Sequence, residues 1–351
     1  MVGLDSYSGN LKSKTCPELR RRIQIRKLAG FLAIVVTLTM CGAVAEAQQA
    51  KKVPRIGFLA PSSSAFITPL VEAFRQGLRE LGWIEGHNIT IDYRWAEGNP
   101  ERLPDLAAEL VRLKVDVIVT AGEPAVRPAQ QATKTIPIVM AASSDPIGSG
   151  LVASLARPGG NTTGLSAMTR ELNLKRLELF KTAVPGLTRV AVLRYSGYEP
   201  HTSSFKELET AAPVLGVKLQ SLELSGLDDL DRVFDSAKKG RAGGLILLRH
   251  VVILSHQTQL ARVAAKYRLP SIFDNSDFVL GGCLMSYGAN NADLYRRAAV
   301  YVDKILKGTK PTDLPVEQPM NFELIINLKT AKQIGVTIEP NHLARANKVI
   351  R

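Results

Sequence analysis

The sequence predicts an α/β protein built from two Rossmann-like lobes, each with a parallel β-sheet. Short runs rich in Val, Ile and Leu alternate with segments of helical spacing from Val53 almost to the end of the chain. Runs without polar alternation are typical of strands that a parallel sheet buries on both faces. Removing the first 47 of the 351 residues leaves 304, about twice the length of a typical domain, which favours two lobes.

The first half of this region has the sequence pattern of alternating strands and helices. Strands are predicted at 53–60, 89–95, 115–120 and 136–142, and helices at 66–81 and 104–113. Gly82 follows the first helix directly, as a glycine that ends a helix does. The second half predicts further strands, with helices between them, at 189–195, 217–224, 245–248 and 270–273.

Three segments are predicted to carry the chain between the lobes. They are the Gly/Thr-rich stretch 156–164, the stretch 287–290 and the proline-rich stretch 310–319. Three crossings make each lobe discontinuous, so we expect one lobe of residues 53–164 plus 288–318 and another of 165–287 plus 319–351. A ligand site is then expected in the cleft between the lobes, at the carboxyl ends of the strands.

Residues 1–47 read as a secretory signal peptide. A basic cluster from Arg20 to Lys27 precedes an apolar run of about 14 residues, which closes on Ala-x-Ala patterns ending at Ala47. The run is short for a membrane span, which needs about 20 residues, so a retained anchor is a weaker interpretation. Cys41 follows Met40 rather than a small residue, which disfavours a lipoprotein. We therefore expect a cleaved signal and a periplasmic protein.

Composition argues against several classes of function. The chain has 45 basic and 32 acidic residues, but the basic ones are scattered, which does not predict a nucleic-acid interface. Its five histidines show no metal-binding spacing, and there is neither a Gly-x-Ser-x-Gly elbow nor a Walker loop. We therefore predict no enzyme activity, no metal and no cofactor. Cys283, in an apolar run, is expected to be a small buried residue.

Polar residues follow successive predicted strands of the first half. Ser62, Ser63 and Ser64 follow the first strand and precede a helix, where hydroxyls and free N–H groups could receive a carboxylate. Asp145 follows a later strand and is suited to pairing with a ligand ammonium group. Helix capping is the alternative for the serines and for Asp145.

The second half places polar and aromatic residues at strand ends in the same way. Together the two halves give a candidate ligand-binding set that consists of Ser62, Ser63, Ser64, Glu123, Ser144, Asp145, Tyr195, Asn275 and Tyr287.

Four stretches of the chain together resemble one known family. They are Gly82–Ile89 with Tyr93–Pro104, Thr133–Met140 with Asp145–Asn161, Gly282–Gly288 with Asp293–Gly308, and Leu314–Pro319 with Asn327–Ala331. Over residues 53 to 350 the chain resembles ABC-transporter substrate-binding proteins of the group often labelled tryptophan/tyrosine uptake.

The resemblance implies a type I periplasmic binding protein with three crossovers and a cleft that closes about a hinge. It also implies that a small organic solute, an amino acid or a related compound, is delivered to a permease and its ATPase subunit. We expect a monomer, with the candidate residues above in the cleft. Glu123 and the pair Arg249-His250 depart from the family pattern, which extends the expected ligands to charged solutes.

Two other functions are compatible with the same fold. A periplasmic ligand-sensing subunit for a receptor kinase would need the same cleft, and an exported enzyme could be built on it. A two-lobed repressor is disfavoured because the signal-like segment occupies the place of an N-terminal helix-turn-helix.

Overall fold

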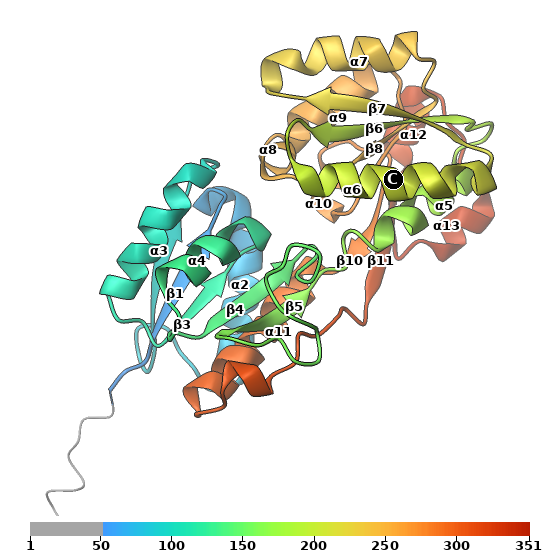
Figure 1. Cartoon of the computed structure of the whole chain (residues 1–351). Helices are drawn as coiled ribbons and strands as arrows, with labels where there is room; N and C mark the ends of the chain where they lie inside the picture. The colour runs from blue at the N-terminus through green and yellow to red at the C-terminus, as the bar shows by residue number, and fades with distance from the viewer. Residues whose placement is uncertain (1–51) are drawn as a thin grey trace, which may run out of the picture. The chain divides into compact units, whose positions relative to one another are not determined.

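The computed structural model describes residues 52–351, so the predicted signal peptide lies outside the described residues. Residues Val53–Arg351 form one compact unit that contains two β-sheets, each with its own helices (Figure 1). No helix within residues 52–351 is both long and apolar enough to cross a membrane.

The first sheet has five strands in the order β2-β1-β3-β4-β5, and every neighbouring pair is parallel. Its strands are β1 (Arg55–Ala60), β2 (Thr90–Trp95), β3 (Val117–Thr120), β4 (Ile138–Ser143) and β5 (Thr162–Ser166). The helices that connect them are α2 (Ser64–Glu80), α3 (Leu103–Arg112) and α4 (Val126–Ala132), with the short 3-10 turns η2 (Pro100–Arg102) and η3 (Glu123–Ala125). All residues of β3, β4 and β5 are buried, as strands covered on both faces must be.

The second sheet has seven strands in the order β12-β11-β10-β9-β8-β6-β7. They are β6 (Arg189–Tyr195), β7 (Lys218–Leu224), β8 (Gly244–Leu247), β9 (Ser271–Phe273), β10 (Met285–Ala289), β11 (Phe322–Asn327) and β12 (Lys348–Ile350). Its helices are α5 (Leu172–Ala183), α6 (Glu199–Ala211), α7 (Leu230–Lys239), α8 (Val251–Ser255), α9 (Gln257–Lys266), α10 (Ser276–Leu280), α12 (Leu328–Ile334) and α13 (Pro340–Arg345). All pairs are parallel except β10 with β11.

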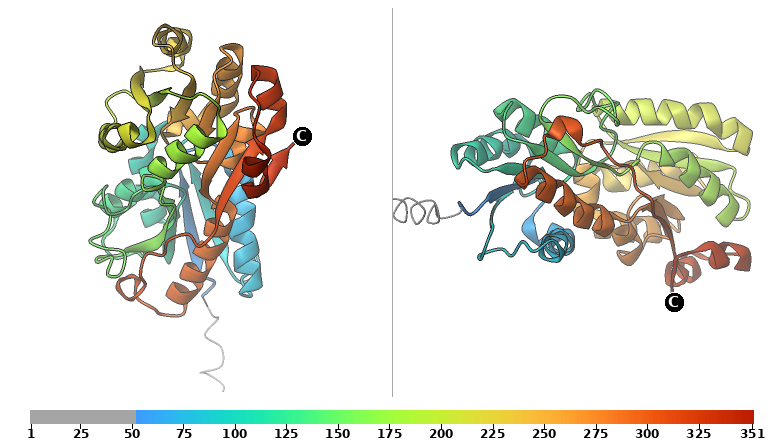
Figure 2. Two further views of the ribbon diagram at one scale, coloured as in Figure 1. Left: turned by 90° about the vertical axis from the view of Figure 1, so that its right-hand side faces the viewer. Right: turned by 90° about the horizontal axis from the view of Figure 1, so that it is seen from below.

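The chain passes between the two sheets three times. It leaves the first sheet after β5, returns after β10 to form α11 (Asn291–Leu306), and re-enters the second sheet at β11 through η6 (Pro311–Asp313). Helix α11 packs on α2 and on β4 of the first sheet, as its orange ribbon shows among blue and green elements in Figures 1 and 2. The prediction of two α/β lobes joined by three crossovers is therefore confirmed.

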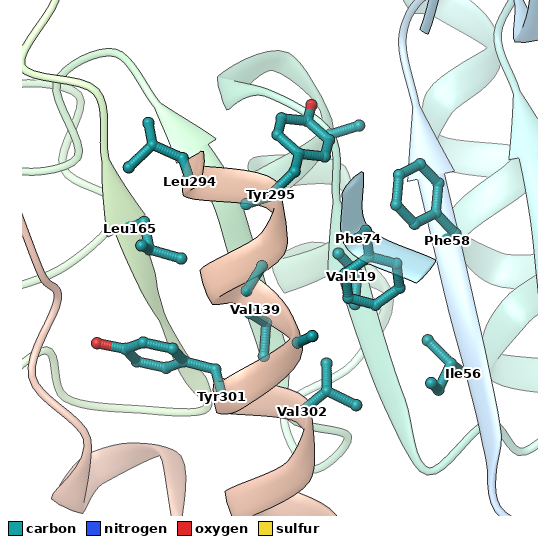
Figure 3. Packing of buried hydrophobic residues seen from close by; sticks show 14 of the residues in the cluster. Ile56, Phe58, Phe74, Val119, Val139, Leu165, Leu294, Tyr295, Tyr301 and Val302 are labelled. Carbon is teal, nitrogen blue, oxygen red and sulfur yellow. The ribbon is translucent and has the colours of Figure 1, made fainter. Parts of the chain in front are cut away.

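The core of the first lobe joins residues that are far apart in the sequence. Phe58 on β1 and Phe74 on α2 lie with Val139 on β4 against Tyr295 and Val302 on α11 (Figure 3). Each of these side chains is almost fully buried, and each buried aromatic or aliphatic side chain contributes about 1.5–3 kcal/mol through burial. This burial ties α11 to the first sheet, although strands of the second sheet precede and follow it in the chain.

The structure corrects two expectations about the sheets. Residues Thr162–Ser166, expected in part to be a crossing segment, form the buried edge strand β5. These residues are too polar to show the apolar pattern of a buried strand. The buried Thr163 hydroxyl has a hydrogen-bond partner, because it donates to the carbonyl of Leu314 at 2.7 Å. The second correction is that β11 runs antiparallel to β10, so the second sheet is mixed rather than wholly parallel.

Gly77 allows α2 and α11 to approach closely, and its replacement gives a stability prediction. A Cβ atom at Gly77 would lie 2.3 Å from the backbone carbonyl oxygen of Arg296 on α11. We expect Gly77→Ala to lower the unfolding free energy by about 1–3 kcal/mol, and with it the urea midpoint, because overpacking outweighs the better helix propensity of alanine. Gly226→Ala is the control, since nothing lies within 4 Å of the added atom. Equal midpoints for the two variants would contradict close packing at Gly77.

Candidate ligand-binding site

A cavity of about 310 Å³ lies where the carboxyl ends of strands from both sheets meet. Ligand sites of open α/β sheets are found at such strand ends. The first lobe contributes residues after β1, β3 and β4, with α2, α11 and the η2 turn, and the second lobe contributes residues after β6, β8 and β9. The lining residues are Pro61, Ser62, Phe66, Ile67, Leu70, Pro100, Ala121, Gly122, Glu123, Pro124, Ser144, Tyr198, Arg249, His250, Leu254, Asn275, Asp277 and Tyr295.

The start of α2 forms one part of the wall. Ser62 follows β1 directly, and Phe66, in the first turn of α2, presents an aromatic face to the cavity. No side chain caps the helix at Ser63, so the helix start lacks the usual hydroxyl acceptor for its first N–H groups. This end of the cavity therefore combines an apolar ring with hydrogen-bond donors.

Glu123 lines the cavity from the turn after β3, and its carboxylate is oriented by its own lobe. Oε2 accepts hydrogen bonds from the Ser143 hydroxyl at 3.2 Å and from the Asp145 backbone N–H at 2.9 Å. Oε1 accepts a short hydrogen bond from the Ser149 hydroxyl. These bonds fix Glu123 between the β3 and β4 ends, and the ion pairs within residues 52–351 include none to it.

The second lobe supplies a stack of aromatic rings. The rings of Tyr195 and His250 are parallel with centroids 3.8 Å apart, and Tyr198 packs edge-on against both His201 and His250. Tyr198 and His250 face the cavity, whereas Tyr195 lies behind His250. Such contacts hold the two cavity rings in place.

Both histidines of this stack are neutral at physiological pH. His201 Nδ1 accepts the N–H of Tyr195 at 2.8 Å, so Nε2 carries the proton and donates to the Arg249 carbonyl at 3.0 Å. Burial lowers the pKa of His201 to about 4, and it lowers the pKa of His250 to about 4 with a smaller contribution from the charge of His201.

The buried histidine predicts a loss of stability in acid. The folded pKa of His201, about 4, lies below the ordinary value of 6.5, so the unfolded chain binds more protons between these values. Stability gained from neutral His201 is therefore complete above about pH 6.5 and is lost as the pH falls towards 4. We expect His201→Gln to flatten urea midpoints over this range, while His87→Gln, at an exposed site, leaves the profile unchanged. Parallel profiles for wild type and His201→Gln would contradict this assignment.

A buried ion pair lies beside the aromatic stack. Arg249 Nη1 donates to Asp274 Oδ2 at 2.8 Å, and the Asp274 side chain is only 4% exposed. Burial alone would lower the pKa of Arg249, but Asp274, with smaller contributions from Tyr295 and Glu123, raises it above its ordinary value. The cavity therefore contains a charged guanidinium on the wall of the second lobe.

A second arginine lies fully buried behind this pair, at the crossing segments. Arg176 on α5 donates to the carbonyl of Thr169 at 2.8 Å, just after the first crossing, and to the carbonyl of Tyr287 at 2.7 Å, just before the second. Burial lowers the pKa of Arg176 to about 10, which the charge of Asp274 partly offsets. Arg176 Nη2 and Asp274 Oδ1 have no hydrogen-bond partner among the described residues.

The structure brings four of the nine candidate residues to the cavity: Ser62, Glu123, Ser144 and Asn275. Ser63 and Ser64 are not among its lining residues. Asp145, expected to face a ligand, instead accepts the guanidinium of Arg170 at 2.8 Å and the Gly148 N–H at 2.8 Å. Its carboxylate is thus already paired with an arginine that follows the first crossing.

The remaining candidates, Tyr195 and Tyr287, also lie outside the cavity wall, with the Tyr287 ring near that of Phe322. Sequence reasoning missed Phe66, Tyr198 and Tyr295. Tyr198 lies only three residues after the end of β6, so a search for polar residues just after strand ends could have found it. Tyr295 lies within a helix and carries no such signal.

The family model described as "ABC transporter substrate binding protein" matches residues 59–350. The chain belongs to this family. It is thus a solute-binding component of an ABC transporter, with the type I periplasmic-binding-protein fold. Proteins of this family bind a small molecule outside the cytoplasm and act with a permease and its ATPase.

Relatives and solved structures agree with this assignment. A tyrosine-binding protein of Clostridioides difficile (strain R20291) is 28% identical over 266 residues, which cover 76% of each chain. A Streptococcus pneumonia ABC domain solved in complex with L-Trp has a TM-score of 0.75 and 26% identity, covering 84% of this chain and all of that one. A conserved domain protein of Vibrio cholerae has a TM-score of 0.78 and 28% identity, covering 85% and 100%.

Proposed function

We propose that this substrate-binding protein takes an aromatic amino acid, or a close relative of one, into the cavity between its lobes. The observation that carries the proposal is the composition of the cavity wall. Aromatic and aliphatic side chains (Phe66, Leu70, Tyr198 and Tyr295) stand together with an oriented carboxylate and a charged guanidinium. A solute with one ring and a charged polar head would satisfy both parts of this wall.

The known relatives support this ligand class. Tyrosine is named for the Clostridioides difficile relative and L-Trp for the Streptococcus pneumonia complex. The cavity volume of about 310 Å³ is at the lower end of the range for small-molecule sites, about 300–1,000 Å³. That size favours one amino acid over a peptide.

Lobe boundaries and location form part of the same proposal. We place the lobes close to the expected ranges of 53–164 plus 288–318 and 165–287 plus 319–351, with two boundaries moved by two residues so that β5 ends in the first lobe at Ser166 and β10 ends in the second at Ala289. The packing of α11 on the first sheet and of β11 in the second supports this division. We further propose export through the basic and apolar segment 20–47, with cleavage near Ala47, and a monomer that delivers its solute without chemical change.

Mass spectrometry of the natively purified protein tests the ligand class. The protein is isolated from its own cells without any ligand-removal step, then denatured, and the released small molecules are identified. Tyrosine, tryptophan or a close aromatic relative at near-stoichiometric amount is the expected result. A stoichiometric sugar or a purely aliphatic solute would contradict the proposal. If nothing is released, the emptied protein is titrated with both aromatic amino acids, and failure to bind either would also contradict it.

A further inference from the structure

The two walls of the cavity carry opposite charges that the protein leaves open to a ligand. Glu123 belongs to the first lobe and Arg249 to the second, and both line the cavity. We propose that the solute is oriented by this pair, with its cationic group at Glu123 and its anionic group at Arg249. This inference rests on the proposed function, because it states which end of an amino acid each lobe holds.

Glu123 has the properties of an acceptor for a cation. Its three hydrogen bonds come from two hydroxyls and one backbone N–H, all neutral donors of the first lobe. A carboxylate offers about four acceptor positions, so capacity remains for one further donor. A half-buried carboxylate without a positive partner in the described chain is expected to favour an ammonium group, because charge-assisted bonds are the stronger ones.

Arg249 has the corresponding properties of a donor for an anion. Asp274, through Nη1, is the one hydrogen-bond partner that the described residues give its guanidinium. A guanidinium has five N–H groups, so Nε and Nη2 remain to bind a carboxylate in the bidentate manner typical of arginine. Asp274 pairs with Arg249 and its charge also acts on the buried Arg176, so these three side chains together retain one positive charge.

The two charges act on each other across the cavity. The carboxylate of Glu123 contributes to raising the pKa of Arg249, and after burial it is the second cause that raises the pKa of Tyr198 to about 12. The walls of the two lobes are therefore within electrostatic range. A zwitterion placed between them would give each charge a ligand partner, whereas a solute with a single charge would leave one of them without such a partner in a poorly solvated cavity.

The opposite orientation has a candidate as well, which the test must separate. Asp277 lines the cavity from α10, and a ligand ammonium could lie there with its carboxylate at the start of α2. Burial raises the pKa of Asp277, whereas three hydrogen bonds from neutral donors hold the Glu123 carboxylate in position at the cavity wall. We therefore assign the cationic group to Glu123.

Titration calorimetry with three related solutes tests the orientation. L-tyrosine carries both groups, tyramine lacks the carboxylate, and 3-(4-hydroxyphenyl)propanoate lacks the ammonium group. For wild type we expect each analogue to bind at least about tenfold more weakly than tyrosine, as the loss of a charged hydrogen bond implies. In Glu123→Gln the discrimination against the propanoate should fall to about threefold or less, while that against tyramine persists. In Arg249→Lys, which keeps a positive charge for Asp274, the discrimination against tyramine should fall by about tenfold.

Asp277→Asn separates the two orientations, because it should keep the discrimination against the propanoate that Glu123→Gln loses. The control variant is Asp229→Asn, outside the cavity, which should keep both discriminations as in wild type. If Asp277→Asn lost its discrimination against the propanoate while Glu123→Gln kept it, the opposite orientation would be established and the inference overturned. Wild type that binds all three compounds equally would overturn the inference alone. If wild type binds none of them, the series is repeated with L-tryptophan, tryptamine and 3-(indol-3-yl)propanoate, and failure to bind L-tryptophan as well would contradict the proposed function, and the inference with it. Thermal midpoints measured without solute check that each variant folds. If Arg249→Lys does not fold, the affinities of Glu123→Gln for the three solutes test the inference.

Discussion

Replacing Asp274 by alanine is expected to cost about 3–5 kcal/mol of unfolding free energy, the largest stability effect that we predict. Asp274 is the hydrogen-bonded partner of Arg249, and its charge also acts on Arg176, whose side chain is fully buried. Without it, two guanidinium groups in a poorly solvated region lose the carboxylate that pairs with Arg249 and that acts most strongly on Arg176. The measurement is urea unfolding of wild type and Asp274→Ala, followed by circular dichroism.

An exposed ion pair provides the control for this experiment. Asp229 pairs with Arg232, whose side chain is 65% exposed, and such pairs contribute little to stability. Asp229→Ala should therefore leave the urea midpoint almost unchanged. The assignment of Asp274 as counter-ion to two arginines is wrong if Asp274→Ala unfolds at the same urea concentration as Asp229→Ala.

Replacing Tyr198 by alanine is expected to weaken solute binding by about 10- to 100-fold, the largest effect on affinity that we predict. Its ring faces the cavity and is held by edge-on contacts with His201 and His250, so it meets a ligand without further loss of freedom. Aromatic side chains fixed in this way dominate the energetics of many binding sites. The change is measured by titration calorimetry with L-tyrosine and L-tryptophan.

A second tyrosine of the same lobe provides the matched variant. Tyr267 packs against Phe234 at the surface and donates a hydrogen bond to Asp235, outside the cavity. Tyr267→Ala should keep the wild-type affinity for both amino acids. Equal affinities in Tyr198→Ala and Tyr267→Ala would show that the aromatic stack takes no part in binding.

Much of the fold could be predicted because buried parallel strands have a plain signature. The run Arg189–Tyr195 is a strand with the bounds expected from its sequence, β8 is shifted by one residue at both ends, and β9 begins one residue later than expected. Strand β5 could not be found in this way, since its Thr162, Thr163 and Gly164 lack the apolar signature. The Thr163 hydroxyl donates to the carbonyl of Leu314, about 150 residues away, and no local sequence pattern indicates such a contact.

The site was predictable only in part, for a related reason. Strand ends located Ser62, Glu123, Ser144 and Asn275 at the cavity, because topology alone brings strand ends together. Asp145 also follows a strand, but Arg170, 25 residues further along the chain, engages its carboxylate. Which polar side chain at a strand end is left for a ligand depends on such tertiary partners, and the sequence does not show them.

Direct titration of the ligand-free protein tests the central claim that the cavity between the lobes takes an aromatic amino acid. The protein is unfolded, dialysed, refolded and titrated with L-tyrosine and L-tryptophan, with D-arabinose as the control solute. The account predicts saturable binding of at least one aromatic amino acid at one site per chain. At 100 times the dissociation constant, that solute should add about 2.7 kcal/mol to the unfolding free energy. Binding of neither amino acid, or equal binding of arabinose, would contradict it.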